Sequence, residues 1–392
     1  MGNCCEPAQI NMRKRTEASQ NMSGIMEMLD KDGLKSVHYL SQNTMDTSES
    51  TQENLSKYEI HQLIGRGSYA KVFLVSRCLT GEKYAMKVLK KCEMECKRDV
   101  KRVFIEKDII QHLDHPFIVK LYSTFQTKDK AYFILDLLSG GDIYSHIMKE
   151  KHFTEERARF YAAEMVLALG HLHDNEIVYR DLKPQNIVID SEGHVKLTDF
   201  GLSKTNFQQD QKNTICGTMK YIAPETISGE KYTYTIDWWS LGIILYRMLT
   251  GKLPHPTSIN KRIPYYIINY NLPFKSELLS KPAYDLITKL CVRKPEHRLG
   301  AGGVNEIKAH PFFKEIDWEK LYNKEIEPPY IPREELHLQD NIKGGIEDTV
   351  VKSKKKGAFS EEYFKNFSFA SPEVMDSSAT MYEEFEEKKD SW

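Results

Sequence analysis

The residues best suited to chemistry are two aspartates, a lysine and an asparagine that lie close together in the chain. Asp181, Lys183 and Asn186 belong to the segment YRDLKPQN (179–186), and Asp199 opens an Asp-Phe-Gly sequence eighteen positions after Asp181. An aspartate can accept the proton of an attacking hydroxyl, and Asn186 and Asp199 offer the oxygen ligands that Mg²⁺ prefers. We therefore expect phosphoryl transfer to a hydroxyl, with Asp181 as the base and the metal on Asn186 and Asp199.

A glycine-containing segment upstream could cover phosphates, because glycines let backbone N–H groups approach them without side-chain obstruction. Its members are Gly65, Arg66, Gly67, Ser68, Tyr69, Ala70, Lys71 and Val72. Taken alone, this segment fits a plain hairpin turn equally well. Lys87 follows in a strand-like run and could hold the inner phosphates, with Glu106 on the next helix as its partner. A strand lysine with no such context is usually an exposed charge.

The elements that must position these residues change in type along the chain. Short β-branched or aromatic runs predict strands at 58–64, 70–78, 83–89, 120–127 and 131–138, with a helix at 97–113. Helical periodicity then dominates at 143–150, 154–174, 236–249 and 283–290. We expect an α+β fold with a small antiparallel β lobe (58–138) and a large helical lobe (139–313). Residues 1–57 are expected to be flexible, 314–372 a tail, and 373–392 an acidic flexible end.

Composition excludes several classes of protein. The chain has 55 basic and 56 acidic residues, so its net charge of -1 predicts no general attraction to nucleic acid. The sequence has no run of eighteen apolar residues, so no membrane-spanning helix is expected. The seven cysteines do not have the spacing of metal ligands, and no secretory signal precedes them. We therefore expect reduced thiols in a cytoplasmic protein.

With these segments in order, the chain resembles a eukaryotic protein kinase, and specifically the AGC group of serine/threonine kinases. The resemblance covers roughly residues 58–370. It implies a bilobal kinase fold, ATP and Mg²⁺ as cofactors, protein substrates and an upstream activating kinase. It gives Asp181 the role of catalytic base and Lys183 that of the lysine that contacts the γ-phosphate. Two segments, 223–225 and 237–242, match those that brace the substrate platform, and Arg298 matches the partner of Glu225.

The resemblance also implies an apolar adenine pocket in which the base stacks between side chains. Its expected lining is Ile64, Val72, Ala85 and Val188, with Leu135 at the back and Asp136–Leu138 as the hinge. Ordinary core packing is compatible with the same residues. Ala70 stands where the family usually has a third glycine, and Tyr179 replaces a common histidine.

Two phosphorylation sites are implied by position. Thr214 lies between Asp-Phe-Gly and Ala-Pro-Glu, and Arg180, Lys204 and Arg102 occupy the family positions that bind its phosphate. Ser368 lies in the sequence FKNFSF (364–369), which fits the AGC hydrophobic motif that docks beside the Glu106 helix. The alternatives are an unmodified loop threonine and a minor core strand.

Substrate choice follows from charges on the large lobe. Asp142 keeps one acidic position that favours upstream arginine, and Thr218 begins the platform expected to contact the substrate. Gln185 replaces a second acid, and Arg247 stands where some relatives have glutamate. We therefore expect arginine preference about three residues upstream and weak preference at two.

The amino terminus, MGNCCE, resembles a dual acylation signal with myristate on Gly2 and palmitate on Cys4 or Cys5. Glu6 departs from the preferred serine or threonine, and a soluble tail is the alternative. Membrane association on the cytoplasmic face would follow from acylation. Two other functions remain open: a membrane-tethered pseudokinase scaffold, and a small-molecule phosphotransferase of related fold.

Overall fold

The computed structural model describes residues 53–67, 70–94, 96–205, 217–255, 262–332 and 361–374. The chain divides into two compact units, residues 1–52 and 53–392, and all described residues belong to the second.

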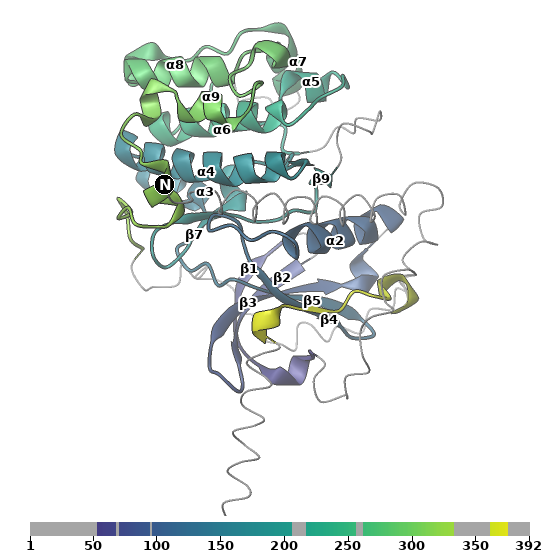
Figure 1. Ribbon diagram of the computed structural model, residues 1–392. Coiled ribbons are helices and arrows are strands. Elements are labelled where there is room, and N and C mark those ends of the chain that lie inside the picture. Colours follow the sequence, from purple (N-terminus) through teal and green to yellow (C-terminus); the bar gives the residue numbers. More distant parts are fainter. Residues whose placement is uncertain are drawn as a thin grey trace, which may run out of the picture. The chain divides into compact units, whose positions relative to one another are not determined.

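Five strands from the first part of this unit and one from the tail form a six-stranded antiparallel sheet with the strand order β1-β2-β3-β5-β4-β10 (Figure 1). Strands β2 to β5 have runs of consecutive buried residues, so both of their faces are covered. One face belongs to a core that includes Phe73, Met86 and Ile134. The strands are β1 (Tyr58–Arg66), β2 (Ala70–Arg77), β3 (Lys83–Lys90), β4 (Leu121–Gln126), β5 (Lys130–Leu135) and β10 (Phe369–Ala370).

Helix α2 (Lys97–Ile110) packs against this sheet and contacts β4. Its buried face carries Val100, Val103 and Ile110, whose spacing of three and seven residues places them on one side of a helix. Glu106 lies on the same buried side, which directs its carboxylate toward the sheet.

The second half of the unit is helical and is built around α4 (Glu155–Asp174) and α6 (Thr235–Thr250), which pack against each other. Both helices are buried over most of their length, and Trp238 and Trp239 of α6 are almost completely enclosed. Helix α8 (Lys281–Leu290) packs on α6, and α9 (Val304–Lys308) packs on α4. The other α-helices of the described residues are α3 (Ile143–Glu150), α5 (Pro224–Ile227), α7 (Ile263–Asn269) and α10 (Trp318–Tyr322).

Two short two-stranded sheets lie between α4 and α5 in the chain. Strand β7 (Ile187–Ile189) pairs with β8 (Val195–Leu197), and β6 (Ile177–Val178) pairs with β9 (Lys204–Thr205). Single 3-10 turns complete the fold at Leu55–Lys57, Lys91–Glu93, Pro184–Asn186, Ser276–Leu278, Pro295–His297, Pro311–Phe313 and Glu361–Phe364.

The described part of the tail returns to the sheet (Figure 1, yellow). Strand β10 pairs with β4 in the register Phe369–Thr124 and Ala370–Ser123. The rings of Phe364 and Phe367 are fully buried, and each lies 5.7 Å from the ring of Phe104 on α2. The sequence left two alternatives for the segment 364–369, docking beside α2 or formation of a strand. In the structure the segment docks beside α2 and its end forms a strand.

Two short segments next to the expected boundaries make contacts with the sheet. Residues 53–57 were assigned to the flexible amino-terminal segment, but Glu53 is buried and its carboxylate contacts Arg77 at 3.3 Å. Glu373 and Val374 were assigned to the flexible end, but Arg77 also donates a hydrogen bond to the Val374 carbonyl. A single buried arginine thus holds both segments, a long-range contact that local composition does not reveal.

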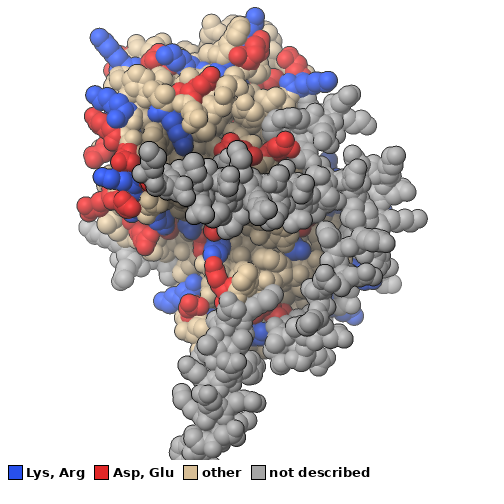
Figure 2. All heavy atoms as spheres, viewed as in Figure 1, with Lys and Arg blue, Asp and Glu red and all other residues tan. Residues whose placement is uncertain are grey.

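The described surface carries charges of both signs. Figure 2 shows lysines and arginines interspersed with aspartates and glutamates on the face that it displays. Within the described residues, no helix combines the length and the apolar character needed to cross a bilayer.

Candidate active site

A cavity of about 1080 Å³ lies between the sheet and the helical half of the unit. One part of its wall is apolar and the other carries charged and amide groups. The apolar part comprises Ile64, Val72, Ala85, Leu135, Leu138 and Val188. The polar part includes Lys87, Glu106, Asp181, Asn186 and Asp199.

Asp181 is the centre of the polar part. Its carboxylate accepts hydrogen bonds from Lys183 Nζ at 2.5 Å, Asn186 Nδ2 at 3.1 Å and Thr218 Oγ1 at 3.2 Å. Burial raises the pKa of Asp181 above its ordinary value, and the nearby Lys183 ammonium opposes that shift. The carboxylate is thus held in place by three donors from two segments and remains on the cavity wall.

The backbone that carries Asp181 is fixed from the helical side. Asp237, at the start of α6, accepts hydrogen bonds from the backbone N–H groups of Tyr179 and Arg180, both at 2.9 Å. Arg180 has a φ of +68°, a left-handed conformation that costs energy in a residue other than glycine. The two bonds to a buried carboxylate offset that cost and fix the direction in which Asp181 points.

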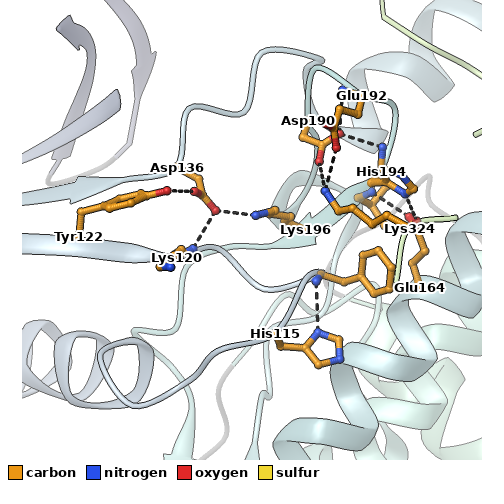
Figure 3. A network of polar contacts seen from close by, with 12 residues as sticks. His115, Lys120, Tyr122, Asp136, Glu164, Asp190, Glu192, His194, Lys196 and Lys324 are labelled. Carbon is orange, nitrogen blue, oxygen red and sulfur yellow. Dashed lines mark hydrogen bonds and ion pairs between the residues drawn. The ribbon is translucent and has the colours of Figure 1, made fainter. Parts of the chain in front are cut away.

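The β7–β8 hairpin carries Asn186 just before its first strand and Asp199 just after its second. Glu164 of α4 braces the hairpin through His194 Nδ1 at 2.6 Å and the Val195 N–H at 2.8 Å (Figure 3). From the other side, Lys324 pairs with Asp190 at 3.0 Å. Asn186 and Asp199 therefore lie at the ends of one clamped hairpin.

Lys87 of strand β3 and Glu106 of helix α2 form an ion pair that joins the two elements. The Lys87 ammonium lies 2.6 Å and 2.8 Å from the two carboxylate oxygens of Glu106. Burial alone would lower the pKa of Lys87, but the carboxylates of Glu106 and Asp199 raise it. Lys87 therefore stays protonated beside the cavity.

The connection between the two halves begins at Asp136, and Figure 3 shows how its carboxylate is held. It accepts hydrogen bonds from Tyr122 Oη at 3.0 Å and the Lys120 N–H at 3.0 Å, both on the sheet side. It also pairs with Lys196 of β8 at 2.6 Å. This cluster fixes the strand end from which the hinge segment 136–138 leaves along the cavity.

The residues of the cavity fit ATP and Mg²⁺. An apolar wall suits a planar base, and Lys87 is a charge suited to phosphate. Asn186 and Asp199 supply amide and carboxylate oxygens, and Mg²⁺ typically takes one or two such ligands together with phosphates and water. Among the described residues, no three His, Cys, Asp or Glu side chains gather as a metal site of their own.

The structure brings most of the expected nucleotide-binding residues to this cavity. Those on its wall are Ile64, Gly65, Gly67, Ala70, Val72, Ala85, Lys87, Glu106, Asp136, Leu138 and Val188. Arg66 and Lys71 occupy opposite positions in the backbone pairing of β1 and β2. Neither residue lies on the cavity wall. Alternation along a strand explains this, since neighbouring side chains point to opposite faces. Ser68 and Tyr69 lie outside the described residues.

Two of the three expected phosphate-binding residues are neighbours. Arg180 follows β6, and Lys204 is in β9, which pairs with β6. The Arg180 guanidinium donates to the carbonyls of Leu202 and Ser203 and to the Tyr232 hydroxyl. Arg102 lies on α2 and pairs with Asp99 at 3.8 Å. Thr214, their expected ligand, is outside the described residues, as are Gly2, Cys4 and Cys5.

Asp142 and Thr218, the expected substrate contacts, both have partners. Asp142 caps α3, since its carboxylate accepts from the Ser145 N–H at 2.9 Å and the Ser145 hydroxyl at 2.8 Å. It also lines the cavity, as does Gln185. Thr218 donates to Asp181, so it lies beside the position that an acceptor hydroxyl must reach.

Sequence reasoning missed the residues that brace the site from behind, chiefly Glu164 and Lys196. Glu164 had a detectable signal: it is a single acid within an otherwise apolar helical run, a pattern that indicates a buried polar contact. Lys196 had none, because its partner Asp136 is distant in sequence.

Comparisons with known proteins agree with this geometry. Residues 58–313 match the family model described as the protein kinase domain. The chain is 44% identical to ribosomal protein S6 kinase alpha-2 of Mus musculus over 329 residues, which is 82% of this chain and 44% of that protein. It is 45% identical over 342 residues to ribosomal protein S6 kinase alpha-6 of Danio rerio, which is 82% of this chain and 45% of that protein.

Over 283 residues, the chain is 48% identical to ribosomal protein S6 kinase alpha-3 of Homo sapiens, which is 71% of this chain and 38% of that protein. The chain thus spans less than half the length of these relatives.

Proposed function

Because the chain belongs to the protein kinase family, we propose that it is an active serine/threonine kinase of the AGC group that phosphorylates proteins. The predictions of the family and of the α+β kinase fold are confirmed. The observation that carries the proposed activity is the position of Asp181, which contacts Lys183, Asn186 and Thr218 on the wall of a cavity that also contains Lys87 and Asp199.

In the proposed mechanism, Asp181 orients the acceptor hydroxyl and accepts its proton. Its buried position and raised pKa make it a better base than an exposed aspartate. Thr218 would help to place the acceptor, since its hydroxyl already lies 3.2 Å from Asp181. Lys183 would stabilise the negative charge that develops on the transferred phosphoryl group.

Lys87, Asn186 and Asp199 would hold ATP and Mg²⁺. When bound, the metal neutralises phosphate charge and the nucleotide supplies the γ-phosphoryl group. Glu106 acts through Lys87, because the ion pair fixes the direction of the ammonium. The Glu164 and Asp237 contacts keep Asn186, Asp199 and Asp181 in register.

The experiment that tests this function is transfer of labelled phosphate from ATP to mixed serine- and threonine-containing peptides, with Asp199→Asn as the control. Ribosomal protein S6, for which the relatives are named, is the first protein substrate to test. A scaffold that only binds, or a small-molecule phosphotransferase, would leave the peptides unlabelled. The presence of Lys87, Asp181 and Asp199 at the cavity favours the active kinase.

We also propose that phosphate on Thr214 activates the enzyme. The hydrogen-bond acceptors of Arg180 are two carbonyls and a hydroxyl, so its positive charge is available to a phosphate. Arg102 is one turn from Glu106 on α2, so a phosphate that reached it would also order the Lys87 ion pair. Thr214→Ala should lower the rate sharply, and an unchanged rate would contradict the proposal.

Phosphorylation of Ser368 is the second proposed control. Its side chain is exposed between the buried Phe367 and the half-buried Phe369, so a kinase could reach it while the tail stays docked. Phosphorylation by an upstream kinase should raise the activity of the wild-type chain. Ser368→Ala should have lower activity, and the same treatment should not raise it.

Acylation of Gly2 and of Cys4 or Cys5 is retained as a proposal on the basis of the sequence MGNCCE, with cytoplasmic location and attachment to the cytoplasmic face as its consequence. Membrane fractionation tests it. Gly2→Ala should move the protein to the soluble fraction, whereas an unchanged membrane fraction would refute it.

For domains, we propose a kinase domain at 58–313 with lobes that meet at residue 138, followed by an AGC tail at 314–372. The contacts of Glu53 and Val374 with Arg77 support an extension of the folded unit to 53 and 374. Limited proteolysis should yield a stable core with these ends.

A further inference from the structure

The tail carries a serine whose hydroxyl is buried without a partner. Only 6% of Ser371 is exposed, and its Oγ has no hydrogen-bond partner among the described residues. Both backbone polar groups of Ser371 are bonded: the N–H donates to the Tyr122 carbonyl of β4 at 2.8 Å, and the carbonyl accepts from the Val374 N–H at 3.1 Å. Because buried polar side chains normally have partners, the enclosed hydroxyl calls for an explanation.

The sequence around Ser371 marks it as a target for one class of enzyme. Of the 15 prolines in the chain, only Pro372 follows a serine or a threonine. Proline-directed kinases accept a serine or threonine only when the next residue is proline, which has a fixed φ and no backbone N–H. Ser371 is therefore the one residue of this sequence that such a kinase recognises.

The segment 371–374 is held to the sheet by contacts that can open. Lys120 Nζ pairs with Glu373 at 2.5 Å, but this ion pair is partly exposed and contributes little. Arg77 donates a hydrogen bond to the Val374 carbonyl at 3.1 Å. Strand β10, which precedes the segment, has two residues. A short strand with partly exposed contacts opens more readily than the core, so the segment can leave the sheet while the rest of the domain stays folded.

Two residues that anchor the segment also hold the start of the hinge. The Tyr122 hydroxyl and the Lys120 N–H both donate to the carboxylate of Asp136 (Figure 3). Tyr122 thus contacts the tail through its carbonyl and Asp136 through its hydroxyl. Release of the segment 371–374 therefore removes a restraint from the residues that position the hinge beside the cavity.

We propose that Ser371 is a phosphorylation site for a proline-directed kinase and that its phosphate keeps the segment 371–374 off the sheet. In this reaction Oγ of Ser371 forms a bond to the γ-phosphorus of ATP, and the bond from that phosphorus to ADP breaks. The hydroxyl proton passes to a base of the other kinase.

The charge of the phosphate explains why it would oppose docking. A phosphoserine carries a charge of about -1.5 to -2, and enclosing it at the position of the Ser371 hydroxyl is costly unless cations receive it. Lys120 and Arg77 are cations that contact the segment. Each already pairs with a carboxylate, Glu373 or Glu53. The docked tail therefore favours the uncharged hydroxyl.

The two serines of the docked tail would act in opposite directions. Ser368 is exposed while the tail is docked, whereas Ser371 is reached only after its segment has detached. Phosphate on Ser371 therefore selects the detached tail, as a ligand selects the state that binds it. The effect of Ser371 on activity rests on the proposed kinase function, whereas its effect on docking does not.

The first experiment installs phosphoserine in place of Ser371 in the full chain and measures hydrogen exchange of residues 369–374. Phosphoserine in place of Ser276, an exposed serine of the helical half, is the matched control. Exchange should become at least about tenfold faster with phosphate at 371, because a charge is costly to bury, and should stay unchanged with phosphate at 276. Unchanged or slower exchange with phosphate at 371, as would result if Lys120 or Arg77 bound it, overturns the proposal.

The second experiment asks whether the site is modified from the detached state. A mitogen-activated protein kinase serves as the proline-directed probe, with Asp181→Asn as the substrate chain so that it does not label itself. Label should appear on Ser371 and be lost in Pro372→Ala. Adding Phe367→Ala, which removes a buried ring of the docked tail, should speed labelling by about tenfold or more. No label on Ser371, or equal rates with and without Phe367→Ala, would contradict the proposal.

The third experiment measures the link to the hinge. The chain with phosphate at 371 should have a KM for ATP that is raised by about fivefold, the size expected for one lost hydrogen bond, whereas phosphate at 276 should leave KM unchanged. An unchanged KM in a chain whose segment has detached overturns this link. If the unmodified chain labels peptides no faster than Asp181→Asn does, the proposed kinase function itself is wrong, and the exchange measurement still decides whether phosphate on Ser371 releases the tail.

Discussion

Glu106 holds the Lys87 ammonium by both of its carboxylate oxygens, at 2.6 Å and 2.8 Å. This ion pair joins strand β3 to helix α2. The same helix carries Phe104, which packs against Phe364 and Phe367 of the tail. A continuous set of contacts therefore runs from the docked tail through α2 to the lysine at the cavity.

The first prediction concerns this ion pair. Glu106→Gln keeps the size of the side chain but removes its charge, so Lys87 loses its fixed orientation. We expect kcat/KM for ATP to fall by about 100-fold, the size of effect that a small misplacement of a binding group produces. Steady-state kinetics with varied ATP measure this. Glu93→Gln is the matched control, because Glu93 pairs with Lys90 on the surface, where ion pairs contribute little. Equal rates for wild type and Glu106→Gln would contradict the account.

The second prediction concerns the tail. Phe104→Ala and Phe367→Ala each remove one side of a contact between rings 5.7 Å apart. Each change should lower kinase activity and increase proteolysis of residues 361–374. The double variant should have nearly the same activity and proteolysis as either single variant, because one change already removes the contact. Leu278→Ala, at a half-exposed side chain in the helical part, should instead add its effect to either. Full additivity of the two phenylalanine changes would show that the rings do not act together.

A third prediction follows from Glu164, whose burial raises its pKa to about 7 from 4.5. Between these two values the folded protein binds a proton that the unfolded chain has already released, so the free energy of unfolding should fall as pH rises through this window. The shift corresponds to about 3 kcal/mol at most. Urea denaturation at several pH values measures it, and the difference between wild type and Glu164→Gln isolates this residue. A Glu164→Gln variant with the same pH dependence as wild type would show that another group is responsible.

The pH profile of catalysis gives a fourth prediction. Burial raises the pKa of Asp181, so the base is protonated, and activity lost, at a higher pH than for an ordinary aspartate. Lys183 opposes this shift, so Lys183→Met should move the acidic limb of kcat/KM to still higher pH. An acidic limb that stays in place in Lys183→Met would mean that Asp181 does not set it.

The sequence was sufficient to predict the five strands between residues 58 and 138, the long helices and most of the residues on the cavity wall, because each depends on local periodicity or on short motifs. The expected helix 143–150 coincides with α3, and Thr154, placed at the start of the next helix, is the residue that caps α4. Lys87 and Glu106 meet as expected, since a strand and the following helix bring them together.

Contacts between distant segments could not be predicted. Arg77 joins Glu53 to Val374, and no local pattern marks any of the three. The expectation for Arg247 was based on its charge, but its burial against Tyr144 and Tyr221 depends on how α3 and α6 pack. Arg66 and Lys71 fell within a motif but lie off the cavity wall, because a motif does not specify which face each side chain occupies.

The most direct test of the kinase account compares wild type with Asp181→Asn in transfer of labelled phosphate from ATP to peptides, followed by identification of the labelled amino acid. Asparagine keeps the size of the side chain but cannot accept the proton, so the rate should fall by about 10³-fold, while binding of ATP, measured by thermal stabilisation, is retained. The account predicts label on serine and threonine with wild type alone. Equal transfer by Asp181→Asn, or wild-type label confined to tyrosine, would contradict it.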